Sequence, residues 1–293
     1  MVRYCGREFS DADLALLHQL LRDRDTYPTR AALSRALCEA LDWRRPNGQF
    51  KDMSARQALL RMQADGLIVL PEPQRRGGGS TAQRTVAWTA ASDPQPPITG
   101  FRGDLRDLRL APVHDRRDLA LWRELIARYH YLGYTPLTGA RMHYLIYDGE
   151  RHLGAIGFGA SAWALAPRDR FIGWTRAERE RHLPLVVNNA RFLILPWVHV
   201  KYLASAVLAL AAKQVVRDWE ARHHFRPVLL ETFTDPRYFA GTCYRAANWI
   251  DVGETQGRGK LDRHTQRALP VKTIFLYPLD PRFREKLTAP LGC

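Results

Sequence analysis

A proline-rich segment at residues 93–97 separates two stretches of this chain that differ in hydrophobic pattern. The segment is Asp-Pro-Gln-Pro-Pro, a composition typical of a linker. Before it, leucines recur at helical spacing; after it, short apolar runs alternate with helical ones. The 293 residues are enough for two domains. We predict a first domain at residues 1–90, a linker at 91–104 and an α/β (α+β) domain at 105–293.

The first domain has the pattern of a winged helix-turn-helix. Ser10, Thr29 and Asp52 each precede a run with apolar residues on one face, and Ser, Thr and Asp are favoured helix N-caps. Two β-like runs follow, at residues 67–70 and 85–88, on either side of a turn rich in proline, arginine and glycine. Three helices followed by a hairpin are the layout of a winged helix.

The charge balance favours a polyanionic partner. The chain has 44 lysines and arginines against 30 acidic residues, for a formal net charge of +14. Nucleic acid is the commonest polyanion, although an arginine-rich composition alone gives the same excess. The four cysteines have no CxxC spacing, so we predict no zinc site. With no apolar signal region and no stretch long enough to span a bilayer, we expect a cytoplasmic protein without a membrane partner.

Basic and amide side chains gather on the third predicted helix and in the turn after it. Arginine and glutamine suit bidentate contacts with guanine and adenine edges, and a mobile basic tip suits phosphate or minor-groove contacts. The alternatives are a solvated helix face and a protein-binding module. The candidate DNA-contacting residues of this domain are Lys51, Arg56, Gln57, Arg61, Arg75 and Arg76.

The second domain resembles the GNAT acyltransferases. Its predicted order is strand, helix, hairpin, strand, long helix, strand, short helix and two strands, with Asp148-Gly149 as the hairpin turn. The segment Cys243–Gly253 resembles the GNAT segment in which a tyrosine precedes the final hairpin. That tyrosine often acts as the general acid in the family, and Tyr244 is the matching residue.

One segment departs from the GNAT pattern. Family members hold the acetyl-CoA pyrophosphate in a glycine-containing loop at the start of the long helix. Here Pro196–Ala204 has no glycine. His199 and Lys201 could hold a phosphate, but bulky side chains obstruct a tight backbone cradle. The resemblance in fold therefore does not carry the acetyl-CoA cofactor with it.

A more specific resemblance covers most of the chain. It rests on five motifs: Arg128–Gly133, Asn188–Trp197, Leu230–Phe233, Gly241–Trp249, and Gly257–Lys260 with Asp262 and Arg263. These motifs, in this order, resemble those of the DruA family, which is named for a component of the Druantia anti-phage system and also occurs beside transposon genes. The resemblance implies phage defence or mobile-element biology and gives no reaction.

Two residues in these motifs have both a catalytic and a structural interpretation. His130, between two tyrosines at a helix end, is a candidate general base or an aromatic-packed histidine. Tyr244 is a candidate general acid, a candidate nucleophile that forms a phosphotyrosine link to DNA, or a core tyrosine with one hydrogen bond. Cys243 beside it is interpreted as a packed small residue.

The acidic residues leave two possibilities open. Glu231 lies inside an apolar strand, where a lone carboxylate is costly. It could pair with Arg191 or Arg245, or join Asp235 and Asp262 in a metal-binding set that supports Mg²⁺-dependent phosphodiester cleavage.

The glycine-rich basic loop near the C-terminus suits phosphate binding, and its alternative is a solvated loop. The tryptophans of the second domain are expected mostly in the core, with one or two available to stack bases. The candidate nucleic-acid-binding residues of the second domain are Arg191, Arg245, Arg258, Lys260 and Arg263.

The leading hypothesis is a DNA-processing protein of the DruA kind. The winged helix would place the basic second domain on double-stranded or single-stranded DNA, with defence or transposon proteins as partners. The alternatives are an acyl-CoA-dependent N-acyltransferase and a non-enzymatic adaptor that docks a helicase or transposase onto DNA.

Overall fold

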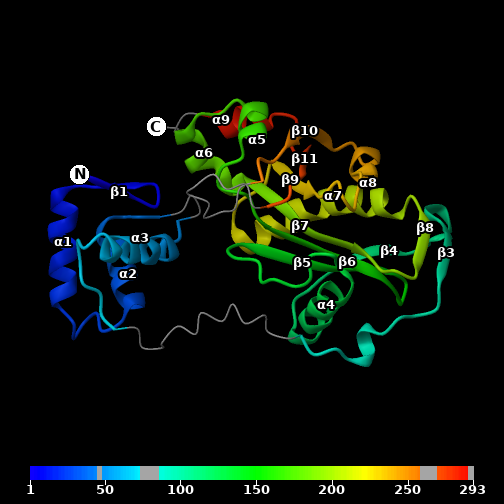
Figure 1. The fold of residues 1–293 in the computed structure, drawn as a ribbon, viewed down its shortest axis with the longest axis horizontal. Helices are drawn as coiled ribbons and strands as arrows, with labels where there is room; N and C mark the ends of the chain where they lie inside the picture. The colour runs from blue at the N-terminus through cyan, green and yellow to red at the C-terminus, as the bar shows by residue number, and fades with distance from the viewer. Residues whose placement is uncertain (45–47, 73–85, 258–268, 290–293) are drawn as a thin grey trace. The chain divides into compact units, whose positions relative to one another are not determined.

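The computed structural model describes residues 1–44, 48–72, 86–257 and 269–289. The chain divides into two compact units, residues 1–84 and residues 85–293 (Figure 1). We describe each unit by itself.

Unit 1, as far as it is described, combines a short hairpin with three helices, and all three predicted helices are present. Ser10 caps the first helix in a reciprocal capping box with Asp13, and the hydroxyl of Thr29 accepts the Ala32 amide at the start of the second. The prediction that Asp52 caps the third was wrong, because Asp52 is its first helical residue. The elements are β1 (Val2–Tyr4), β2 (Arg7–Phe9), α1 (Asp11–Arg22), α2 (Arg30–Ala40) and α3 (Asp52–Ala64).

The β1–β2 hairpin was not predicted. Its turn residues Cys5 and Gly6 both have positive φ angles, 50° and 82°, which is the requirement of a type I′ turn. The predicted strand at residues 67–70 is not formed. Ile68 and Leu70 are nevertheless buried in the core of unit 1, and the Leu70 amide donates to Gln63 Oε1 at 3.0 Å. The predicted wing tip, with Arg75 and Arg76, lies outside the described residues.

Unit 2 is built on a mixed sheet, seven strands wide in the described residues, in the order β10-β11-β9-β7-β6-β5-β4. The β7–β9 pair is parallel and the other pairs are antiparallel. The order of these elements along the chain is the one expected for a GNAT-like fold. The strands are β4 (Leu108–Pro112), β5 (Arg141–Asp148), β6 (Arg151–Ala160), β7 (Val186–Ile194), β9 (Leu229–Thr234), β10 (Ile250–Glu254) and β11 (Thr273–Pro278).

Two long helices cover opposite faces of this sheet (Figure 1). His143 and Tyr144 are neighbours on β5, so their side chains point to opposite faces. The His143 ring lies 4.1 Å from the Trp122 ring of α4 (Arg116–Tyr129), whereas the Tyr144 hydroxyl donates to Asp218 of α7 (Leu203–His223). Shorter helices are α5 (Ala166–Ile172), α6 (Arg176–His182), α8 (Thr242–Ala246) and α9 (Phe283–Thr288).

A separate parallel pair of strands was missed in the sequence. Residues Ile98–Phe101, which the sequence analysis places in the linker, form β3, and they pair with β8 (Val198–Lys201). Thr99, Phe101, His199 and Lys201 are exposed on one face of this pair. In the described part of the chain, no helix combines the length and the apolar character that a bilayer crossing requires.

Candidate functional site

The sheet of unit 2 opens where its one parallel pair of strands ends. The parallel pairing of β7 with β9 runs from Val186 to Asn189 and then stops, although β7 continues to Ile194. A bulge at Ala190, where β7 pairs with β6, changes the register at the same place. A bulge bends its strand and re-aims the side chains that follow it. The two strands therefore separate, and Arg191 lies just beyond the point of separation.

Tyr244 fills the inner end of this opening. Its side chain stacks on the Phe275 ring at 5.6 Å and is 6% exposed. Its hydroxyl donates to Asn189 Oδ1 at 2.8 Å and lies 3.4 Å from Thr232 Oγ1. Burial raises the pKa of Tyr244 well above its usual value. Of its three interpretations, the geometry fits the core tyrosine, because both a general acid and a DNA nucleophile need an accessible hydroxyl.

Glu231 belongs to a buried ion pair. Arg168 of α5 donates to Glu231 Oε2 at 2.8 Å, the Ala162 amide donates to Oε1 at 2.7 Å, and both charged side chains are fully buried. Burial raises the pKa of the Glu231 carboxyl, and Arg168 opposes that rise. The predicted partners Arg191 and Arg245 were wrong. Arg168 was missed because the sequence analysis assigned no element to its segment.

At the outer end of the opening, cationic side chains gather around one carboxylate among the described residues, and that carboxylate already has a partner. Arg237 donates to both oxygens of Asp235, at 3.0 and 2.7 Å, and holds the pKa of Asp235 below its usual value. Lys272 precedes Thr273, which pairs with Thr234, so Lys272 faces Asp235 across the two strands. Burial lowers the pKa of Lys272, and Arg191 and Arg237 lower it further.

Arg191 is the least compensated of these cations. It is half-buried, and burial lowers the pKa of its guanidinium. Its Nη1 donates to the Ala190 carbonyl at 2.7 Å, but its buried Nε has no hydrogen-bond partner among the described residues. This does not set Arg191 apart, because among the described residues the Nε atoms of Arg7, Arg123 and Arg179 are also buried without a hydrogen-bond partner.

His130 ends α4 and lies in the same cluster. Burial, with the positive charges of Arg191 and Lys272, lowers the pKa of His130 to about 4. Its Nδ1 accepts the Leu132 amide at 3.2 Å, so the ring proton of the neutral form is on Nε2. A neutral ring that carries its proton on Nε2 is a hydrogen-bond donor at that atom. This geometry does not support the predicted general base.

Three exposed aromatic side chains complete the group. The Tyr131 ring lies 5.2 Å from that of Tyr238 and 5.3 Å from that of Phe239, and the three are 37%, 61% and 52% exposed. None of the three was a candidate site residue in the sequence; Tyr238 lies four residues beyond the end of β9. We call the whole group the strand-end cluster: His130, Tyr131, Arg191, Asp235, Arg237, Tyr238, Phe239 and Lys272.

The other predicted binding residues lie elsewhere. Arg245 is bound to Asp251 at 2.8 Å. On α3, Gln57 and Arg61 are exposed, whereas Arg56 Nε donates to Ser34 Oγ at 3.4 Å. Lys51 directly precedes α3. Arg258, Lys260, Asp262 and Arg263 lie outside the described residues.

The acidic residues give no metal site in the part of the chain that the structure describes. Glu231 and Asp235 each bind their own arginine. Among the described residues, no three histidine, cysteine or acidic side chains gather in a way that could hold a metal ion.

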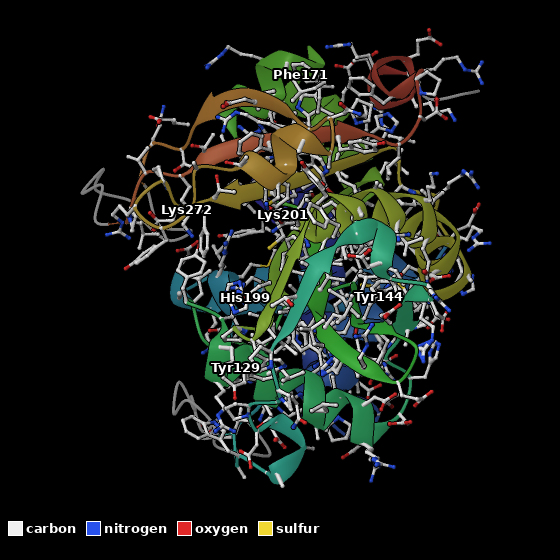
Figure 2. The ribbon with its side chains drawn as sticks, turned by 90° about the vertical axis from the view of Figure 1, so that its right-hand side faces the viewer. Tyr129, Tyr144, Phe171, His199, Lys201 and Lys272 are labelled. Carbon is white, nitrogen blue, oxygen red and sulfur yellow. The ribbon has the colours of Figure 1, made fainter. Side chains whose placement is uncertain are left out.

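The segment before α7 is a strand and not a glycine-containing loop. Backbone amides that cradle a pyrophosphate must be free to point at it. Here the segment forms β8, which carries His199 and Lys201 and pairs in parallel with β3 (Figure 2). Tyr202 then turns into the helix with a φ of 67°. Lys201 lies 5.2 Å from the Phe101 ring. The segment that was compared with the GNAT cofactor loop therefore forms strand β8.

A family model described as "Druantia protein DruA" matches residues 61–268, more than half of the chain. No curated protein matches the sequence. Among solved structures, an aminoglycoside acetyltransferase AAC(6')-Ib in complex with coenzyme A is similar, with 16% identity, a TM-score of 0.38, and coverage of 63% of this chain and 99% of that one.

Two further similar structures are an N-acyl amino acid synthase, FeeM, from uncultured soil microbes, and a probable GNAT acetyltransferase from Chromobacterium violaceum. The first has 14% identity, a TM-score of 0.35, and coverage of 62% and 95%. The second has 13% identity, a TM-score of 0.34, and coverage of 59% and 88%. A shared fold does not imply a shared reaction.

Proposed function

Because this chain belongs to the DruA family, we propose that it is a DNA-binding protein of anti-phage defence or mobile elements. In this proposal the three helices of unit 1 act as a helix-turn-helix module that brings the chain to double-stranded DNA. The strand-end cluster of unit 2 then holds the sugar–phosphate backbone.

The observation that carries the proposal is the excess of positive charge in the strand-end cluster. Among the described residues of the cluster, Arg191, Arg237 and Lys272 face one carboxylate, Asp235, and Arg237 already binds it. Keeping uncompensated charges half-buried is unfavourable unless a ligand of opposite charge binds there. A phosphate supplies that charge and can accept hydrogen bonds from guanidinium and ammonium groups such as those of Arg191 and Lys272.

Unit 1 contributes through the exposed face of α3. Gln57 and Arg61 are exposed and four residues apart, so they lie on one side of the helix. Both side chains can make bidentate contacts with base edges in the major groove. Arg56, which is tied to Ser34 and lies 3.9 Å from Asp52, is better placed to contact a phosphate than to read a base.

The buried positions of Tyr244 and Glu231 favour a non-enzymatic binding role over strand cleavage. Both had been candidates for catalysis, and both are engaged inside the protein. A second candidate function is therefore an adaptor that binds DNA and docks a helicase or transposase onto it. The acyltransferase alternative is less favoured, since the segment that was compared with the GNAT cofactor loop is strand β8.

The test is binding and strand integrity of labelled duplex and single-stranded DNA, with and without Mg²⁺, over a series of salt concentrations. We expect wild-type protein to bind with a salt dependence that reports phosphate contacts. Arg56→Ala/Arg61→Ala should weaken duplex binding, and Arg191→Ala/Lys272→Ala should weaken binding to both forms. Salt-independent binding, or none, would overturn the proposal. Cleavage that disappears in Tyr244→Phe would restore the enzymatic interpretation.

A further inference from the structure

The aromatic part of the strand-end cluster is a surface in its own right. We call Tyr131, Tyr238 and Phe239 the aromatic shelf. The three rings contact one another with centroids 5.2 to 6.4 Å apart, yet each is more than a third exposed. They come from two segments over a hundred positions apart in the sequence. A group of aromatic side chains left exposed on a folded unit is typical of a binding surface.

The shelf is held in place before any ligand binds. The amides of Tyr238 and Phe239 both donate to the Asp235 carbonyl, at 3.0 and 2.9 Å, which fixes the turn after β9. Arg237 is held by Asp235 and lies 5.5 Å from the Tyr238 ring. Rigid aromatic side chains lose little conformational entropy on binding.

The shelf lies beside the cations that we assign to the phosphates. Burial raises the pKa of the Tyr131 hydroxyl, and the charges of Arg191 and Arg237 beside it partly oppose that rise. His130 stacks on Tyr131 with the rings 5.0 Å apart and itself feels Arg191 and Lys272. Flat aromatic faces and cationic groups therefore share one small area of unit 2.

We propose that the aromatic shelf stacks unpaired bases of single-stranded DNA while Arg191 and Lys272 contact the adjacent phosphates. The proposal rests on the DNA-binding function proposed above and specifies its ligand. In a duplex the faces of the bases are covered by their neighbours, so only an unstacked strand can offer them to the rings. Stacking on aromatic side chains beside a basic groove is the general way in which proteins hold single strands without reading their sequence.

The deciding variant is Tyr238→Ala/Phe239→Ala, tested with labelled oligothymidine and with a duplex of the same length. We expect the affinity for oligothymidine to fall by about tenfold to a hundredfold, because each stacked base contributes a substantial share of the binding. Affinity for the duplex should stay as in wild type. An equal loss on both ligands, or no loss on oligothymidine, would overturn the proposal.

The matched control is Phe101→Ala. Phe101 is 52% exposed, as Phe239 is, and it also lies beside a cation, Lys201. It belongs to β3, outside the strand-end cluster, and its removal should leave both affinities unchanged. A loss on oligothymidine equal to that of the shelf variant would show that any exposed aromatic residue contributes, and the shelf would lose its special role.

A second measurement covers the case in which the double variant fails to fold. Phe239→Trp keeps an aromatic face and should retain affinity, and its fluorescence should be quenched by oligothymidine and not by duplex. Quenching by both ligands, or by neither, would contradict stacking. If wild-type protein binds no DNA of either kind, the proposed function itself falls. If it binds duplex and the shelf variant loses no affinity for oligothymidine, only the present inference falls.

Discussion

Two charged clusters of unit 2 share strand β9 and differ in how their charges are balanced. Around Glu231, within the described residues, two carboxylates meet two guanidinium groups: Arg168 binds Glu231 and Asp169, and Arg179 binds Asp169. Just beyond the end of the strand, Asp235 is bound by Arg237, while Arg191 and Lys272 have no carboxylate of their own in the described cluster. The first cluster, which we call closed, is balanced in charge, whereas the second, which we call open, has an excess of positive charge that we propose an anionic ligand neutralises.

The largest effect should come from breaking the closed cluster. Arg168→Met leaves the Glu231 carboxylate buried without a partner, and we expect the free energy of unfolding to fall by about 3–5 kcal/mol. Chemical denaturation measures this loss. The matched control is the double variant Arg168→Met/Glu231→Gln, which removes both charges and should recover much of the stability. A single variant as stable as wild type would remove the distinction between the two clusters.

Breaking the open cluster should have the opposite pattern. Arg191→Ala/Lys272→Ala removes repelling cations, so stability should hold or rise, while affinity for DNA should fall by about tenfold to a hundredfold. The slope of log affinity against log salt should fall by about 2, one for each lost phosphate contact. Fluorescence anisotropy and chemical denaturation on the same samples check both parts. If stability falls and affinity does not, this cluster is structural too.

Lowering the pH should test the open cluster through the protonation of His130, which lies within it. Its pKa of about 4 in the folded state lies below the value of 6.5 for an unperturbed histidine. As the pH falls from 6.5 towards 4, the unfolded chain takes up a proton that the folded state does not bind. Stability should therefore be complete above pH 6.5 and fall by up to about 1.4 kcal/mol for each pH unit in that window.

The variant for this test is His130→Gln, compared with wild type by denaturation at neutral pH and near pH 5. His143 and His152 also have a pKa lowered to about 4, so wild type carries several such contributions and the variant should lose only one. An unchanged pH dependence in the variant would mean that burial and the neighbouring cations do not lower the pKa of His130 as inferred.

The smallest effect should come from Arg245, which was also predicted to bind nucleic acid. Its ion pair with Asp251 is exposed on both sides, at 52% and 38%. Arg245→Ala should change the free energy of unfolding by less than about 1 kcal/mol. Its effect on DNA affinity should be well below that of the Arg191/Lys272 pair. A comparable loss of affinity would extend the binding surface to α8.

Much of the sheet could be predicted because its signals are local. The Asp148-Gly149 turn, the apolar runs and the long helix are each readable within a short window. The β3–β8 pair could not be predicted, since its two strands are four residues long and pair across a large sequence separation. In unit 1 the buried extended segment around Ile68 looked like a strand because burial, and not strand pairing, sets its apolar pattern.

The site was predicted less well than the fold. His130, Arg191 and Asp235 were named from their positions at element ends, and the structure brings them together. Their proposed roles depended on partners that sequence spacing does not show. Arg237, two positions from Asp235, takes the carboxylate that had been assigned to a metal. The aromatic shelf was missed because Tyr131 meets Tyr238 only through the tertiary fold.

The β3–β8 pair also has a consequence for the order in which unit 2 assembles. It joins Ile98 to Val198, so β3 leaves the ribosome long before the strand that pairs with it exists. Closing so long a loop for a four-residue parallel ladder is entropically unfavourable until the sheet has brought the ends together. Pulse-labelled hydrogen exchange during refolding should show the β5–β6 amides protected first and those of β3 protected late. Until then Ile98, which packs against the core of unit 2 in the folded chain, stays uncovered in the nascent chain, where chaperones can bind it.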